Sequence, residues 1–124
     1  MSVESENIWD GSGMKAAKAF ERKRAEWRQR DWMTWLAGNL AFPFTVTRME
    51  DRHLHEGDAE NPFRLGHTMR VLGLELEDDL YGVIVKVREK RPVGAVPLCD
   101  VEVEPKTDKN YWPVREYVVW FANR

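Results

Sequence analysis

Four acidic residues within five positions are the strongest candidates for chemistry in this sequence: Glu75, Glu77, Asp78 and Asp79. Side chains two positions apart on an extended segment point to the same side, so the carboxylates of residues 75, 77 and 79 would converge. Calcium takes roughly six to eight oxygen ligands from carboxylates, carbonyls and water, so convergent acids in a loop suit it. Without other evidence, a cluster of acids in a hairpin turn is more often simply solvated than an ion site. The pattern is not an EF-hand, because glycine follows at the eighth position instead of the sixth.

Two further acidic groups could hold a cation. Asp100, Glu102 and Glu104 alternate at the end of an apolar run, and Glu50 and Asp51 lead into a stretch with three more acids. Residues 50–79 carry nine acids and three arginines, a net charge of −6. Alternating acids are also typical of the solvent face of any sheet, so the cation interpretation depends on the three groups together.

The histidines and the cysteine suggest other chemistry. His53 and His55, completed by Glu56 or His67, could form a zinc or nickel site, although a solvated polar loop is the commoner arrangement. Cys99 is the single cysteine and lies in an apolar alternating run, which is typical of a small buried hydrophobe. The sequence shows no Ser-His-Asp or Cys-His spacing and no glycine-rich phosphate loop. We therefore expect a protein that is not an enzyme.

Helices are expected over the first third of the chain. Residues 14–30 carry a narrow apolar stripe, and Ser12 or Asp10 is the expected cap. The stripe consists of Ala17, Phe20, Arg24 and Trp27. Residues 31–40 form a second helical segment, which is capped by Asp31 and ends near Gly38–Asn39. Its apolar residues Trp32, Trp35 and Leu36 are expected to anchor the helical arm.

The first helix is strongly basic, with seven basic and two acidic residues over positions 14–30, a net charge of +5. Its interleaved Phe20 and Trp27 could stack bases beside a phosphate backbone. However, the basic residues encircle the helix and the whole chain has a net charge of −2, so a solvated surface helix is the favoured interpretation. Nucleic acid is not an expected partner.

Short strands follow the helices. Extended segments are expected over residues 40–50, 67–74, 80–90 and 95–99, with a short strand and loop over residues 100–110. Residues 81–88 alternate apolar with polar or small side chains. The C-terminal residues 114–124 are expected to form a helical turn or a last strand. We predict the α+β class, specifically a small SH3-like antiparallel β-barrel with an N-terminal helical arm. The predicted core-facing strand residues are Val71, Val83, Val85, Val96 and Leu98.

The 124 residues predict one domain. Residues 1–13 are expected to be a flexible N-terminus and residues 14–124 a single domain, divided into an arm (14–40) and a barrel with the C-terminal segment (41–124). A single cysteine, an acidic N-terminus unlike a secretory signal and no long apolar run predict a small soluble cytoplasmic protein without a membrane span.

Several motifs together resemble a known family. These are Trp35-Leu36, Leu40-Ala41-Phe42-Pro43-Phe44-Thr45-Val46, Arg70-Val71-Leu72-Gly73-Leu74, Tyr81-Gly82-Val83-Ile84-Val85 and Ala95-Val96-Pro97-Leu98-Cys99-Asp100-Val101-Glu102. They are similar to the CcbP-type family of small bacterial calcium-binding proteins over about residues 35–124. The basic helix before residue 31 lies outside the resemblance.

The resemblance implies a barrel that binds or buffers calcium through surface carboxylates. It carries over Glu50, Glu77, Asp78, Asp79, Asp100 and Glu102, and Asp51 beside Glu50 completes the predicted ligand set. Ala37-Gly38-Asn39 replaces a segment that is acidic in calcium-binding members, so one site is expected to be lost or weakened. The alternative function is an SH3-like interaction module that contacts a protein or nucleic acid through its barrel and basic helix, with no metal.

Overall fold

The computed structural model describes residues 7–50 and 61–124 of the chain. The chain forms two compact units, one comprising the residues up to Asp31 together with Arg124, the other comprising Trp32–Asn123. Helices and an antiparallel sheet follow one another along the sequence, which confirms the α+β class. No helix in the described ranges is both long and apolar enough to cross a membrane.

The first unit contains the short 3-10 helix η1 (Ile8–Asp10) and the helix α2 (Met14–Arg28). Trp9 from η1 packs edge-on against Trp27 of α2, with ring centroids 5.2 Å apart. The expected helix is confirmed, but its buried face is Ala16, Ala19 and Trp27, whereas Ala17 is exposed. The expected cap is wrong. Gly13 occupies the N-cap position in place of Ser12 or Asp10, at φ 94°, which glycine adopts without strain.

The second unit is built on a five-stranded sheet. Its strands are β1 (Phe44–Arg48), β2 (Thr68–Asp78), β3 (Gly82–Arg88), β4 (Val93–Pro97) and β5 (Val101–Glu104). They lie in the order β4-β3-β2-β1-β5, with every neighbouring pair antiparallel. The predicted core residues are confirmed, since Val71, Val83, Val85, Val96 and Leu98 are all at most 1% exposed.

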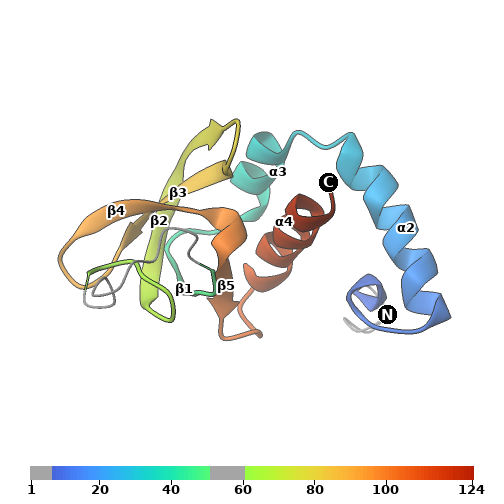
Figure 1. The fold of residues 1–124 in the computed structure, drawn as a ribbon, viewed down its shortest axis with the longest axis horizontal. Coiled ribbons are helices and arrows are strands. Elements are labelled where there is room, and N and C mark those ends of the chain that lie inside the picture. Colours follow the sequence, from blue (N-terminus) through green and yellow to red (C-terminus); the bar gives the residue numbers. More distant parts are fainter. Residues whose placement is uncertain (1–6, 51–60) are drawn as a thin grey trace. The chain divides into compact units, whose positions relative to one another are not determined.

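This sheet is not closed into a barrel. Strands β4 and β5 lie at its two edges, and no strand pairing joins them in the part of the chain that the structure describes. The 3-10 turn η3 (Leu98–Asp100) connects them, and the helix α4 (Tyr111–Asn123) contacts both η3 and β5 (Figure 1). The closed SH3-like barrel expected from the sequence is therefore not confirmed, because a helix rather than a β4–β5 pairing covers this side of the core.

Two helices complete the second unit. The C-terminal segment, expected as a helical turn or a strand, is the thirteen-residue helix α4, which buries Val114, Tyr117 and Phe121 at helical spacing. The helix α3 (Trp32–Asn39) ends where the sequence predicted. Its Trp32 is 3% exposed and packs against Tyr117 and Trp120, with centroids 5.3 and 5.2 Å apart. That residues 14–30 pack on the sheet stays a prediction.

Candidate functional site

The acidic residues 77–79 lie at the tip of the β2–β3 hairpin. Asp78 and Gly82 are register partners, and residues 79–81 form the turn between them. Gly82 has φ 72°, and a Cβ on it would overlap the Tyr117 hydroxyl and the Phe121 ring. The Val83 N–H donates a 2.8 Å hydrogen bond to the Tyr117 hydroxyl oxygen. Helix α4 therefore fixes the base of the hairpin and with it the position of the acidic tip.

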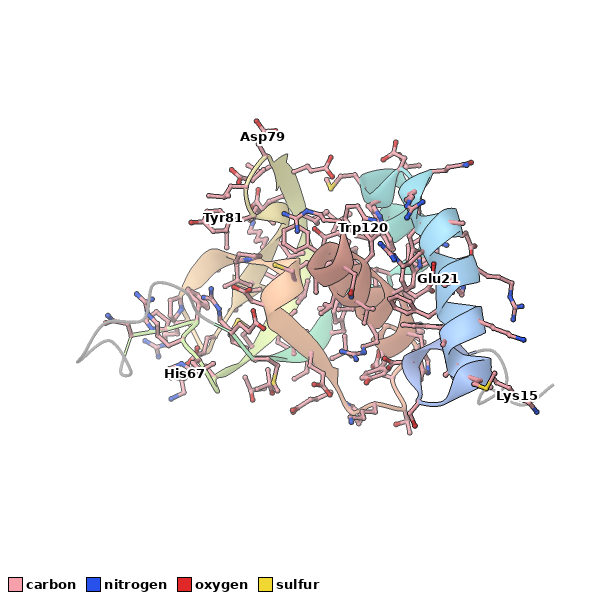
Figure 2. All side chains as sticks on the ribbon, turned by 45° about the vertical axis from the view of Figure 1, so that its right-hand side comes forward. Lys15, Glu21, His67, Asp79, Tyr81 and Trp120 are labelled. Atoms are coloured by element: carbon pink, nitrogen blue, oxygen red, sulfur yellow. The ribbon has the colours of Figure 1, made fainter. Side chains whose placement is uncertain are left out.

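One of the three acids shapes the turn. Asp78 Oδ2 accepts hydrogen bonds from the N–H groups of Leu80 and Tyr81, both at 2.8 Å. This Asx-type turn holds the backbone and leaves Asp78 Oδ1 for another partner. Glu77 and Asp79 are exposed, and Figure 2 shows Asp79 pointing into solvent at the tip.

Cations of the part of the chain that the structure describes do not neutralise the tip. Within residues 7–50 and 61–124, no lysine or arginine lies within 4.0 Å of the carboxylates of residues 77–79. Glu75 and Glu77 belong to β2 itself, which extends further than the sequence predicted. The pairing is irregular between Leu74 and Leu76, so Glu75 falls at a bulge, outside the simple alternation assumed for the acids.

Asp100 has a different environment, because it is only 5% exposed. Its Oδ2 lies 3.0 Å from Nη2 of Arg48, whose other donors reach the carbonyls of Glu50 (2.9 Å) and Phe63 (2.8 Å). The Asp100 carbonyl accepts the N–H groups of Met49 and Glu50. Asp100 therefore positions the chain on both sides of residues 51–60, and its carboxylate already has a cationic partner.

Glu50 and Glu102 line one pocket of about 210 Å³, together with residues of α4. Glu102 lies on β5, where Lys106 Nζ is 3.8 Å from its Oε1. Asp51 and the histidines 53 and 55 lie outside the described residues, so the predicted His53/His55 site has no structural account. His67 Nδ1 is 3.0 Å from Glu89 Oε1.

The structure thus divides the predicted ligands among three places: the hairpin tip, the buried Arg48 ion pair and the pocket beside α4. Among the described residues, no three acids, histidines or cysteines are arranged as a preformed metal site. The donors at the tip are nevertheless of the kind that calcium prefers, namely carboxylate oxygens beside turn carbonyls. Sequence reasoning missed Arg48, although its place in the buried alternation Phe44-Val46-Arg48 was a readable signal.

Comparison with known proteins decides the family. The sequence matches the CcbP family, described as calcium binding, over residues 20–121. The chain belongs to this family. Membership of this family supports calcium as the bound ion. The family is described by calcium binding and not by a catalysed reaction. The match begins inside α2, so more of that helix belongs to the family than the sequence motifs alone indicated.

A solved structure has the same fold. The crystal structure of Anabaena CcbP superimposes with a TM-score of 0.56 at 22% sequence identity, covering 97% of this chain and 85% of that chain. No curated protein matches the sequence.

Proposed function

We propose that the chain binds calcium at the tip of the β2–β3 hairpin, through Glu77, Asp79 and the Oδ1 atom of Asp78. The observation that carries the proposal is three adjacent carboxylates on a fixed turn with no described lysine or arginine beside them. Carboxylates packed this closely repel one another, and a divalent cation would remove that repulsion. Backbone carbonyls of the turn and water would complete the coordination.

The pocket beside α4 is the second proposed location. Glu50 and Glu102 line it together, and Asp51 follows Glu50 directly in sequence. In this proposal Asp100 is a positioning residue, because its backbone carbonyl holds the Glu50 N–H while its carboxylate pairs with Arg48.

The arrangement favours buffering over sensing. Exposed carboxylates at a hairpin tip must rotate to converge on an ion, which costs affinity, so we expect binding in the micromolar-to-millimolar range. Magnesium should bind poorly, because it requires near-octahedral geometry. The protein would act in the cytoplasm, without catalysis. Its sheet order and the η3 turn between β4 and β5 support describing the fold as an opened SH3-like barrel.

Thermal melting tests calcium binding at the tip. With calcium at a hundred times Kd, the native state should gain about 2.7 kcal/mol, visible as a rise of several degrees in Tm. The rise should be much smaller with magnesium, absent with chelator and reduced in a Glu77→Gln/Asp79→Asn variant. Equal melting curves for the parent under all three conditions would remove the proposal.

A further inference from the structure

The outward face of the sheet carries a basic surface at the end opposite the acidic tip. Thr45 of β1, Arg70 of β2 and Arg88 of β3 are successive register partners, so they form one row across three strands. Glu104 of β5 continues the row on the other side of Thr45. Both arginines are exposed. Figure 2 shows His67, which precedes β2, and Asp79, which follows it, at opposite ends of the unit. The eleven residues of β2 separate these two ends by roughly 30 Å.

The two arginines are directly opposed like charges. Such pairs destabilise a sheet unless something neutralises them. Within the described ranges, no carboxylate lies within 4.0 Å of Arg70, Arg88 or the neighbouring Lys90. Glu89 is the nearest acid in sequence, but its Oε1 accepts the Phe63 N–H at 2.8 Å and lies 3.0 Å from His67 Nδ1.

This surface is also concave. Arg70, Arg88 and Lys90 line a shallow, open hollow of about 530 Å³ with Thr45 and Thr68. His67, Met69 and Glu89 also line it, and the Glu89 carboxylate there is held by the Phe63 N–H and His67. That volume falls within the range of about 300–1,000 Å³ typical of small-ligand pockets. Arg70 Nη1 donates a 3.0 Å hydrogen bond to Thr45 Oγ1, which orients its guanidinium group within the hollow.

We propose that this hollow binds a multiply charged phosphate group, such as the oligophosphate of a nucleotide. Guanidinium groups bind phosphate oxygens through paired hydrogen bonds, and the threonine hydroxyls are additional donors. Three cationic side chains and one carboxylate, Glu89, line the hollow, so its net charge is positive and matches an anion with several charges better than a single carboxylate. No phenylalanine, tyrosine or tryptophan is among the residues described as lining the hollow, and the His67 ring there is paired with Glu89, so the phosphate rather than a base would be recognised.

Titration of the calcium-free protein with sodium tripolyphosphate, followed by NMR of the backbone amides, tests the proposal. The amides of Thr45, Thr68, Arg70 and Arg88 should shift. An Arg70→Gln/Arg88→Gln variant should bind about tenfold more weakly. A Lys106→Gln/Lys109→Gln variant, which removes the same charge from exposed positions elsewhere in the same unit, should bind within about twofold of the parent.

Three results would overturn the proposal: no shifts in the parent, shifts centred elsewhere, or an equal loss in the control variant. The same titration with a short single-stranded DNA oligonucleotide tests nucleic acid as the ligand. If it binds and tripolyphosphate does not, the surface is a nucleic-acid face and not a compact phosphate site. Because Arg70→Gln/Arg88→Gln relieves a like-charge pair, its Tm should equal or exceed that of the parent, which separates lost binding from lost folding. The Glu77→Gln/Asp79→Asn variant should bind tripolyphosphate normally, since the tip lies beyond the screening length of roughly 8 Å.

Discussion

Arg48 and Asp100, fifty-two positions apart in the sequence, form a buried ion pair with Nη2 and Oδ2 3.0 Å apart. The side chains are 10% and 7% exposed. The same guanidinium group binds the carbonyls of Glu50 and Phe63, so one arginine ties β1, η3 and both ends of the 51–60 segment together. An acid predicted from sequence to be a metal ligand thus has a structural partner in place.

Replacing Asp100 by asparagine should destabilise the protein. The change leaves the Arg48 charge buried without its carboxylate, which costs about 3–5 kcal/mol at such sites. Urea unfolding measures the loss. The matched control is Glu102→Gln on β5. Glu102 pairs with the exposed Lys106, so losing this ion pair should cost less than about 1 kcal/mol in unfolding free energy. Similar midpoints for the two variants would show that the buried pair contributes little.

Replacing Gly82 by alanine should distort the hairpin. Its φ of 72° disfavours a side chain, and the new Cβ would meet the Tyr117 hydroxyl and the Phe121 ring. We expect a loss of about 2 kcal/mol or more in the free energy of unfolding, together with weaker calcium binding because the tip is displaced.

Gly38→Ala is the control for this change, since nothing lies within 4 Å of a Cβ at that helical position. It should stabilise the protein by up to about 1 kcal/mol. A Gly82→Ala protein with the same Tm as the parent would show that α4 does not fix the hairpin.

Replacing Trp32 by alanine should cost about 3–5 kcal/mol in unfolding free energy, because the side chain is buried against two aromatic residues of α4. Trp35→Ala should cost clearly less, since Trp35 is only half-buried. Urea midpoints compare the two variants. If Trp35→Ala proves the more damaging, the packing of α3 described above is wrong.

Local patterns predicted much of the fold. The alternation of Val83, Val85 and Val87 identified a half-buried strand. Spacing and turn residues predicted a helix over residues 14–30, which ends at Arg28 in the structure, and the end of α3. The pattern of residues 114–124 does not distinguish a helical turn from a strand, although Val114, Tyr117 and Phe121 lie at helical spacing. Pro113 falls in the first turn of α4, where proline is tolerated. The helical period of these three residues is hidden by the other apolar residues between them.

Relationships between distant residues were not predictable. The open sheet depends on how α4 packs beside η3 and β5, and the role of Asp100 depends on Arg48. The row of Thr45, Arg70 and Arg88 requires the register of three strands. A single sequence shows its composition and the local periodicity of its apolar residues. Strand register and the pairing of distant residues are fixed only when the chain packs.

Calorimetric titration with calcium shows whether the hairpin tip binds the ion, using the parent, the Glu77→Gln/Asp79→Asn variant and a Glu21→Gln/Glu26→Gln control that removes the same charge from exposed positions on α2. The parent and the control should bind calcium with the same stoichiometry and affinity. The hairpin variant should lose a site or weaken about tenfold or more, because two carboxylate ligands are gone. Calcium binding by the hairpin variant that is indistinguishable from that of the parent would show that the hairpin tip is not a calcium site.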